Sequence, residues 1–308
     1  MNPNHIHTKR SGIMLAMPFE FSRLEGPSRK AWNSWPVIVQ PKLNGVRCRA
    51  LINNLGHAQL VSSTGAPITS MPHITFALRA SGLRNIELDG ELYQHGMPLQ
   101  EINARVSRKS ASTRHDDYES IEYHVFDVVN DRGQQARLDT LTDAFIGRTR
   151  TGESRAVISQ VDYWPAYSLD EITKVLQQVV AQDYEGIIVR NANALYERKR
   201  STSMMKFKPR YRDTYRIVGV LEEHDKHGAP KGALGALVVH GADGAEFSVG
   251  SGFTRLQRIT YWQERSSLVG RRAEVKYHTL SKLGIPPASV FSCLVGDADE
   301  DKLKGEAG

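Results

Sequence analysis

The sequence predicts an α+β chain of two domains, the second of which is a small β-barrel. Three observations carry this prediction. The chain has 308 residues, about twice the 150 or so that are typical of one domain. Strand-like apolar runs and an amphipathic helical segment occur together before about residue 211, whereas short strands and glycine-rich turns dominate after it. We therefore place the domains at residues 1–211 and 212–308.

The composition is that of a globular protein. Hydrophobic residues make up 40% and charged residues 24%, which provides for a sizeable core and excludes wholesale disorder. The apolar runs are far shorter than the roughly 20 residues needed to cross a bilayer, and the N-terminus lacks the apolar stretch of a secretory signal. Cys48 and Cys293 lie too far apart for a disulfide framework or a zinc knuckle. We expect no membrane association and a reducing, cytoplasmic setting.

Strands are predicted first in the larger domain. The apolar run at residues 37–39 ends at Gln40-Pro41 and is followed by the turn Lys42-Leu43-Asn44-Gly45. A second strand at residues 86–91 contains Asp89-Gly90, which predicts a hairpin bend before Leu92-Tyr93 resumes the strand. The apolar residues 123–129 are typical of a buried strand.

A helix and two further strands complete this domain. Ser168-Leu169-Asp170-Glu171 has the form of a capping box, and apolar residues then recur at helical spacing, which predicts a helix over residues 169–182. It leads into a β-branched strand at residues 185–190. At residues 204–208 the alternation places Lys206 and Lys208 on one face of a strand, and Pro209 ends it.

The smaller domain consists mainly of short strands. One helix is expected at residues 254–268. The strands are expected at residues 216–221, 233–240, 245–249, 272–278 and 289–294. This layout is typical of a five-stranded barrel of the OB type.

Several widespread catalytic motifs are absent from the sequence. It contains no G-x-x-x-x-G-K-[ST] phosphate loop, no G-x-S-x-G elbow, no H-E-x-x-H and no C-x-x-C pair. Lys42, in contrast, lies between a strand and a glycine turn, where a side chain can reach into a cleft. A lysine is nucleophilic only as the neutral amine, and Lys206 and Lys208 are candidate cationic neighbours that would favour that form. Taken alone, Lys42 could equally be an ordinary surface lysine.

Positive charge is concentrated in one part of the chain. The formal net charge is +6, from 40 basic and 34 acidic side chains. Nine basic residues fall between Arg190 and Arg216, against only Glu197 and Asp213. Taken alone, such a cluster is more often a solvated surface, and a polyanionic partner is the more specific alternative.

Five segments with charged or aromatic residues follow one another, each at the edge of an expected strand. They are K-L-N-G at 42–45, E-L-D-G-E at 87–91, Y-H-V-F-D at 123–127, E-G-I-I-V at 185–189 and M-K-F-K at 205–208. This ordered set resembles the covalent nucleotidyltransferase superfamily, and specifically the ATP-dependent DNA ligases with their K-x-D-G-x-R, D-G-E, E-G-x-[IV] and K-x-K motifs. Residues 231–237, 247–253 and 275–277 are similar to the OB domain of small, phage-type DNA ligases.

The resemblance implies a fold, a reaction and its cofactors. The fold would be a nucleotidyltransferase (adenylation) domain of antiparallel sheets and helices, followed by an OB-fold domain. The cofactors would be ATP and Mg²⁺, and the partner nicked duplex DNA. Lys42 would attack the α-phosphate of ATP, expel pyrophosphate and hold AMP, which then passes to the DNA before the nick between 3′-hydroxyl and 5′-phosphate is sealed. Lys206 and Lys208 would bind the α-phosphate and stabilise the developing charge.

The resemblance also implies roles for four other residues. Arg47 would contact the nucleotide or the nick terminus, and Phe126 would stack on adenine. Glu91 would lie near the ribose hydroxyl. Glu185 would coordinate Mg²⁺, with Glu91 as a second candidate carboxylate, because hard cations prefer oxygen ligands. The structural alternatives are solvated carboxylates at strand ends and a phenylalanine that belongs only to the core.

Three positions depart from the family pattern. Asn44 replaces the usual aspartate of the nucleophile motif and carries no charge. Ser63 stands where relatives have an arginine that binds the 5′-phosphate of the nick, so Arg47 or Arg49 would have to make that contact. Residues 286–301 lack the basic side chains that orient pyrophosphate in many relatives, which predicts slow self-adenylylation.

Two alternatives remain open, and they differ in class. An RNA ligase or a capping guanylyltransferase would share the lysine nucleophile and the carboxylates. A nucleic-acid-binding OB protein with a decayed nucleotidyltransferase half would explain the departures at Asn44 and Ser63. A monomer is expected.

Overall fold

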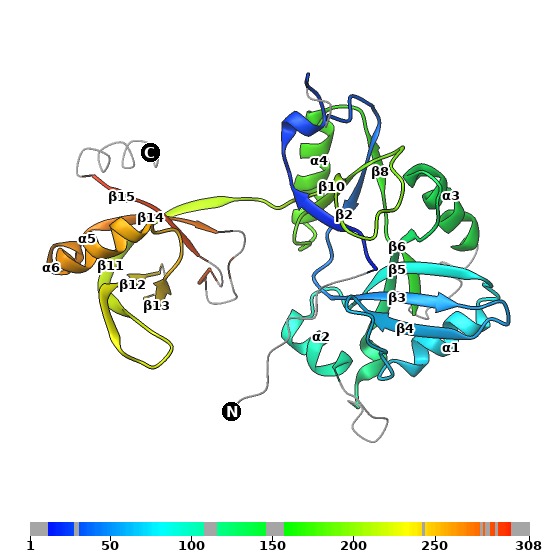
Figure 1. Ribbon diagram of the computed structural model, residues 1–308, viewed down its shortest axis with the longest axis horizontal. Helices are drawn as coiled ribbons and strands as arrows, with labels where there is room; N and C mark the ends of the chain where they lie inside the picture. Colours follow the sequence, from blue (N-terminus) through cyan, green and yellow to red (C-terminus); the bar gives the residue numbers. More distant parts are fainter. Residues whose placement is uncertain are drawn as a thin grey trace. The chain divides into compact units, whose positions relative to one another are not determined.

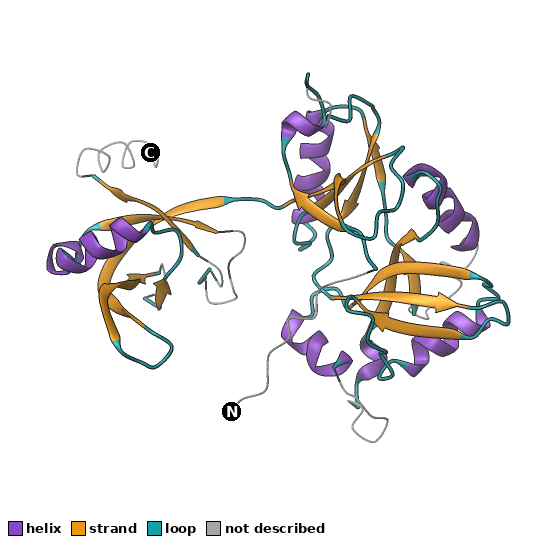
Figure 2. Ribbon diagram, in the orientation of Figure 1, coloured by secondary structure: helices purple, strands orange, loops and turns teal. Residues whose placement is uncertain are grey.

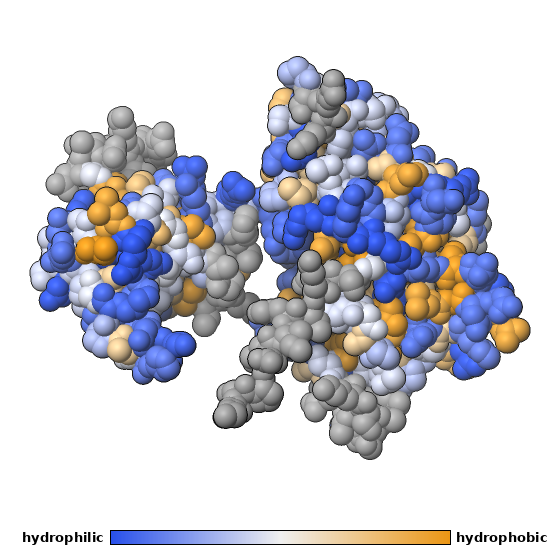
Figure 3. All heavy atoms as spheres, in the orientation of Figure 1, coloured by the Kyte–Doolittle hydropathy of each residue, from blue (hydrophilic) through white to orange (hydrophobic). Residues whose placement is uncertain are grey.

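The computed structural model describes residues 12–27, 31–107, 116–145, 157–241, 244–277, 280, 284–286 and 289–296. The chain divides into two compact units, Met1–Lys208 and Pro209–Gly308. Both units combine strands with helices (Figures 1 and 2). The visible face is largely hydrophilic, with smaller groups of apolar side chains between (Figure 3). Within the described ranges, no helix has the length and apolar character needed to cross a membrane.

The first unit contains two five-stranded sheets. The first sheet has the strand order β1-β10-β9-β2-β8. Its strands are β1 (Leu15–Pro18), β10 (Arg200–Phe207), β9 (Ile187–Asn191), β2 (Val37–Pro41) and β8 (Trp164–Ala166). Only β1 and β10 pair in parallel. Helix α4 (Leu169–Val180) buries Ile172, Leu176 and Val179 in the same apolar cluster as Val37 and Val39 of β2.

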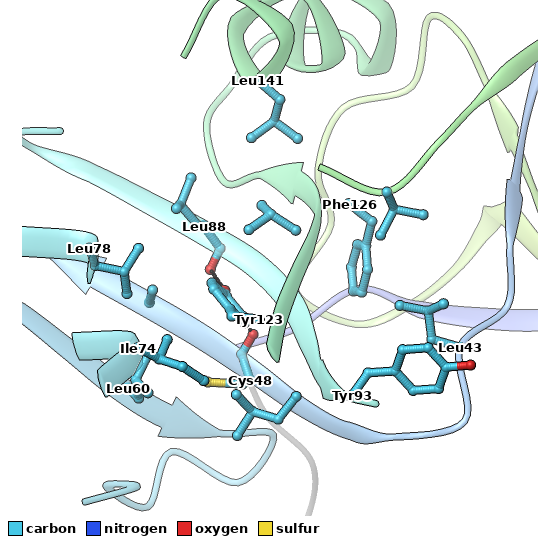
Figure 4. Packing of buried hydrophobic residues seen from close by; sticks show 14 of the residues in the cluster. Leu43, Cys48, Leu60, Ile74, Leu78, Leu88, Tyr93, Tyr123, Phe126 and Leu141 are labelled. Carbon is cyan, nitrogen blue, oxygen red and sulfur yellow. Dashed lines mark hydrogen bonds between the residues drawn. The ribbon is translucent and has the colours of Figure 1, made fainter. Parts of the chain in front are cut away.

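The second sheet has the strand order β4-β3-β5-β6-β7. Its strands are β4 (Ala58–Ser62), β3 (Val46–Ile52), β5 (Ile86–Tyr93), β6 (Glu122–Val128) and β7 (Ile158–Gln160). Three helices accompany it, α1 (Pro72–Ala80), α2 (Leu99–Val106) and α3 (Gln134–Phe145), together with the 3-10 turn η3 (Tyr118–Ser120). Their apolar faces share one buried cluster with the sheet, in which Tyr123 and Leu88 lie at the centre of the view (Figure 4).

Most of the expected elements of the first unit are present. The strands expected at residues 37–39, 123–129, 185–190 and 204–208 are β2, β6, β9 and β10, and the helix expected at 169–182 is α4. The capping box is half formed. The Ser168 hydroxyl accepts the Glu171 backbone N–H at 3.2 Å, whereas the Glu171 carboxylate accepts the N–H of Tyr167 at 2.8 Å.

The hairpin expected at Asp89-Gly90 is wrong, because β5 runs unbroken through both residues. A Cβ atom on Gly90 would lie 2.5 Å from the His124 carbonyl oxygen and 2.7 Å from the Tyr123 ring, so only glycine lets β6 approach this closely. The register with β6 shifts at this point, as it does at a β-bulge. The Asp-Gly pair therefore marks a close approach of two strands and not a turn.

The second unit contains all five expected strands. They are β11 (Tyr211–His224), β12 (Pro230–His240), β13 (Glu246–Val249), β14 (Arg272–Tyr277) and β15 (Val290–Val295). The helix expected at 254–268 is divided at Glu264 into α5 (Arg255–Gln263) and α6 (Arg265–Leu268), and α5 begins with a complete capping box between Thr254 and Gln257.

The OB-type arrangement of the five strands is present, as an open sheet. The strand order is β13-β12-β11-β14-β15, and over the described residues the two outer strands are not paired with each other. Strand β13 has only four residues, and the chain that leaves it makes one bridge, between Ser251 and Val290. The result is an open, OB-like sheet whose apolar face is covered by Leu268 of α6 and Phe291 of β15.

Candidate active site

A cavity of about 520 Å³ lies in the first unit. Its walls come from the ends of β2, β9 and β10 of the first sheet and from β3, β5 and β6 of the second. Six of the residues singled out in the sequence line it: Lys42, Arg47, Glu91, Phe126, Lys206 and Lys208. The two sheets thus bring together side chains that are far apart in the sequence.

Lys42 directly follows β2 at the point where three strands of the first sheet meet. Its backbone N–H donates to the Gly186 carbonyl at 2.8 Å. Gly186 has a φ of +150°, and a Cβ atom there would collide with the Phe207 carbonyl oxygen of β10. The close fit of β2, β9 and β10 therefore determines where the Lys42 side chain enters the cavity.

Glu185 does not line the cavity but binds the lysines that do. One carboxylate oxygen accepts a hydrogen bond from the Lys42 ammonium and the other from the Lys208 ammonium. Burial alone would raise the pKa of Glu185, but the charges and hydrogen bonds of Lys42 and Lys208 outweigh it and hold the pKa below its ordinary value. Glu185 is therefore an anion that links the two lysines.

Lys206 belongs to β10 and lines the same cavity as Lys42 and Lys208. Burial, and then the nearby positive charges of Lys208, Lys42 and Arg200, lower the pKa of Lys206. Two lysines thus bind the Glu185 carboxylate, and Lys206 and Arg200 add two further positive charges at the cavity. Such an excess of positive charge suits a phosphate chain.

Arg47 is held at the cavity wall by a buried aspartate. Its Nε and Nη2 atoms donate to the two carboxylate oxygens of Asp89 at 2.7 and 2.6 Å, and the Asp89 side chain is fully buried. Tyr196 donates its hydroxyl to the same carboxylate. The Arg47 guanidinium carbon lies 4.5 Å from the centre of the Phe126 ring, which lines the cavity.

Glu91 and Asn44 also line the cavity. Burial raises the pKa of Glu91 to about 7, although the charges of Arg47 and Lys42 and a hydrogen bond from the Gly45 backbone act in the opposite direction. Asn44 provides an amide where the family pattern has a carboxylate, so Glu91 is the acidic group on this wall.

Three arginines are candidates for the 5′-phosphate contact that Ser63 cannot make. Ser63 lines the cavity, but Arg47 is bound to Asp89, and Arg49 donates to Glu87 at 2.5 Å. Arg200 lines the cavity as well and donates to the Ala16 carbonyl at 3.0 Å. Residues 297–301 lie outside the described residues, so the expectation of slow self-adenylylation stays a prediction.

Three features of the site were missed in the sequence. Gln40 is 1% exposed and lines the cavity; its amide nitrogen donates to the Phe126 carbonyl at 3.2 Å, while its Oε1 has no hydrogen-bond partner within the described ranges. Arg190 is 3% exposed and is held by Asp127 at 2.9 Å. Ile13, Leu15 and Ala16, at or next to β1, form part of the wall. The period of two along β2 places Gln40 beside Lys42 and would have identified it.

The carboxylates fit a magnesium ion only in combination with a phosphate ligand. Within the described part of the chain, no group of three or more His, Cys, Asp or Glu side chains could hold a metal ion. Mg²⁺ usually keeps several waters and binds through one or two carboxylates and the phosphates of a substrate. Glu185 and Glu91 are donors of this kind.

A lysine at a strand end, cations beside it, a carboxylate and an aromatic ring around one cavity between two largely antiparallel sheets are the attributes of the covalent nucleotidyltransferases. An OB-like unit follows in the same chain. The family model described as ATP dependent DNA ligase domain matches residues 14–208, and the one described as DNA ligase OB-like domain matches residues 227–294. The chain therefore belongs to the ATP-dependent DNA ligase family.

Curated relatives agree with this assignment. The DNA ligase of African swine fever virus (strain Badajoz 1971 Vero-adapted) is 30% identical over 268 residues, which cover 81% of this chain and 61% of the viral protein. The chain thus spans about three-fifths of the length of the viral relatives it matches. The DNA ligase of Haemophilus influenzae is 26% identical over 283 residues, which cover 91% of this chain and 95% of that protein.

Solved structures share the fold. A structure from a study of Lig E DNA ligases gives a TM-score of 0.69 at 19% identity and covers 92% of this chain and 99% of its own. The Chlorella virus DNA ligase-adenylate gives 0.51 at 20% identity, with 92% and 98% covered.

Proposed function

We propose that this protein is an ATP-dependent DNA ligase that seals 3′-hydroxyl/5′-phosphate nicks in duplex DNA through lysyl-AMP and AMP-capped DNA. The observation that carries the proposal is the cluster of Lys42, Glu185 and Lys208 at a cavity of about 520 Å³. Ligand pockets of roughly 300–1,000 Å³ hold molecules of nucleotide size. Membership of the ligase family supports the same conclusion.

In the first step, the neutral amine of Lys42 attacks the α-phosphorus of ATP. A nitrogen–phosphorus bond forms, the bond to the bridging oxygen breaks, pyrophosphate leaves, and the amine loses a proton. Lys206 and Lys208 stabilise the negative charge on the α-phosphate oxygens. When bound, Mg²⁺ supplies further charge neutralisation on the phosphates, and Glu185, with Glu91 as the second candidate, would hold it.

In the following steps, the 5′-phosphate of the nick takes AMP from Lys42, and the 3′-hydroxyl then attacks that phosphate and releases AMP. These steps require DNA at the cavity mouth. Arg198, Lys199 and Arg200 are consecutive and exposed, and Arg200 reaches the cavity. Such residues bind phosphates without reading sequence, so the affinity they provide falls as salt rises.

The base site supports adenine. The Gln40 amide nitrogen donates one of its two hydrogens to the Phe126 carbonyl, and Oε1, which has no hydrogen-bond partner among the described residues, is an acceptor open to a ligand. At the position where adenine carries its amino group, guanine carries a carbonyl oxygen. The adenine amino group can donate to Gln40 Oε1, whereas the guanine oxygen would face it acceptor to acceptor. Phe126 provides an aromatic surface for the ring. This argues against the capping guanylyltransferase alternative.

The test is transfer of label from α-labelled ATP to the protein in the presence of Mg²⁺, followed by denaturing electrophoresis. We expect the wild type to be labelled, Lys42→Ala to be unlabelled, and nicked DNA to discharge the label. Nicked RNA and GTP serve as comparison substrates. If the wild type remains unlabelled after pyrophosphate has stripped any bound AMP, the proposal is wrong, and a decayed nucleic-acid-binding protein becomes the better description.

We further propose that the protein is a cytoplasmic monomer. Cys48 and Cys293 are free thiols, which suits a reducing compartment. Light scattering coupled to size-exclusion chromatography measures the mass directly, and a dimer at working concentration would contradict the monomer.

A further inference from the structure

Glu185 lies in the short connection between α4 and β9, and this connection is fixed at both ends. At one end, Asp183 has a left-handed φ of +63°, and the Tyr184 backbone N–H donates to the Val179 carbonyl at 3.0 Å. At the other end, the Gly186 carbonyl accepts the Lys42 N–H at 2.8 Å. Between these points, Tyr184 directly precedes Glu185.

Tyr184 packs against the apolar clusters of both sheets. Its ring also meets the ring of His95, with the two centroids 4.7 Å apart. His95 is exposed and follows β5 by two residues, and its Nδ1 shares a hydrogen bond of 2.8 Å with the Tyr93 hydroxyl. The hydroxyl of a buried tyrosine thus fixes the orientation of the ring that covers Tyr184.

Tyr93 also lies beside the residue that follows the nucleophile. Tyr93 and Leu43 belong to one buried cluster and lie together at its edge (Figure 4). Leu43 directly follows Lys42, as Glu185 directly follows Tyr184. A path of side chains, Leu43–Tyr93–His95–Tyr184, therefore connects the neighbour of the nucleophile to the neighbour of the carboxylate that binds it.

We propose that His95 is a positioning residue for self-adenylylation: it holds the Tyr184 ring, and thereby the Glu185 carboxylate, in register with Lys42 and Lys208. The inference rests on the proposed ligase function. Because small displacements of a reacting group are costly, we expect His95→Ala to lower the rate constant for lysyl-AMP formation at saturating ATP by about 5- to 10-fold. The KM for ATP should change by less than about 2-fold, since Gln40, Phe126 and Glu91 do not touch His95.

Two conservative variants separate the ring contact from the hydrogen bond. His95→Phe keeps a ring against Tyr184 and should restore the rate constant to within about 2- to 3-fold of the wild type. Tyr93→Phe, which removes the hydrogen bond to His95, should lower the rate constant to the same extent as His95→Phe. The double variant Tyr93→Phe/His95→Phe should be no slower than either single variant, because each substitution removes the same hydrogen bond. His57→Ala, an exposed histidine away from the cavity, is the matched control and should behave as wild type.

The experiment measures single-turnover AMP transfer per active site, with the active fraction determined from the amplitude. A purely structural role for His95 would lower the amplitude and leave the rate constant unchanged, which would overturn the inference. Equal loss in His95→Ala and His95→Phe would overturn it as well. If the wild type forms no lysyl-AMP at all, the proposed function itself has failed, and that outcome is distinct from either of these.

Discussion

Gln40 illustrates how the function of a residue can depend on which of its atoms is already bound. A glutamine amide has a donor end and an acceptor end, and in solution either could face a base. Here the donor end is held by the Phe126 carbonyl, whereas the acceptor has no partner among the described residues and is open to a ligand. The contacts of this one side chain thus make the base site favour an amino group over a carbonyl oxygen.

This leads to a prediction for Gln40→Leu. Loss of one buried hydrogen bond costs about 1–2 kcal/mol, so the KM for ATP should rise by about 5- to 30-fold with a smaller effect on the rate at saturation. The preference for ATP over GTP should narrow, because the acceptor that opposes guanine is gone. Label transfer at varied ATP and GTP concentrations measures both quantities. Gln59→Leu, at an exposed position of β4, is the control, and an unchanged ATP/GTP ratio would contradict the assignment of Gln40.

Glu91 gives a second prediction, on stability. Its pKa is raised from 4.5 to about 7 in the folded protein, so the native state holds this proton more tightly than the unfolded state does. Stability therefore falls as pH increases from 4.5 to 7 and stays lower above it. Glu91→Gln removes this dependence, and we expect its Tm to exceed that of the wild type by a few degrees at pH 8 and to match it near pH 4.5.

Thermal denaturation at both pH values checks this expectation. Glu246→Gln, at an exposed position of β13, should give the same Tm difference at each pH. A Glu91→Gln variant that is equally or less stable than the wild type at pH 8 would show that the ionised carboxylate is stabilising there and would reverse the sign of the argument.

Elements with a local signature could be predicted from the sequence, and those that depend on distant partners could not. Helix α4 has its own cap and apolar spacing, and β2, β6 and β9 are short apolar runs. Strand β1 has only four residues and is defined by its pairing with β10, almost the whole length of the unit away. Its contribution to the cavity was therefore invisible beforehand.

The candidate site follows the same division. The motif residues could be placed in one cavity in advance, because their order along the chain is distinctive. Gln40 and His95 acquire their roles from the Phe126 carbonyl and the Tyr184 ring, and both contacts join segments that are far apart in the sequence. The hairpin predicted at Asp89-Gly90 was wrong because this dipeptide, which often forms a turn, here allows two strands to pack closely.

Strand β5 provides the prediction at this scale. In Gly90→Ala the added methyl group would meet the His124 carbonyl oxygen of β6, and backbone atoms cannot rotate away as a side chain can. Overpacking of this kind costs about 1–3 kcal/mol, which corresponds to a fall in Tm of several degrees. Gly219→Ala, whose added Cβ would be 3.5 Å from its nearest neighbour, is the control and should change the Tm little. Equal Tm values for the two variants would show that β5 and β6 can separate at no cost.

For the whole molecule, the distribution of charge matters more than its sum. A net charge of +6 is modest for 308 residues, yet the basic stretch from Arg190 to Arg216 continues from the first unit into the second. A band of strongly hydrophilic residues crosses the visible face of the first unit (Figure 3). Exposed arginines of this stretch, such as Arg200 in the first unit and Arg212 in the second, offer phosphate contacts on each unit.

Arg210 and Arg212 test this idea without disturbing the cavity, because both are exposed and neither lines it. Each phosphate neutralised contributes about −0.9 to the slope of log affinity against log salt concentration. If each arginine binds one phosphate, the double variant Arg210→Ala/Arg212→Ala should bind nicked duplex DNA more weakly at low salt, with a slope shallower by about 2. Label transfer from ATP should stay at the wild-type rate, since the nucleotide site is intact.

The measurement is DNA binding by fluorescence anisotropy over a series of salt concentrations. Arg79→Ala, at an exposed position of α1 outside the basic stretch, should retain the wild-type slope. A double variant whose slope equals that of the wild type would mean that these arginines are solvated and that the phosphates are bound elsewhere. A shallower slope together with unchanged label transfer would mean that DNA affinity and nucleotide chemistry reside in separate sets of residues, so that each can be altered without loss of the other.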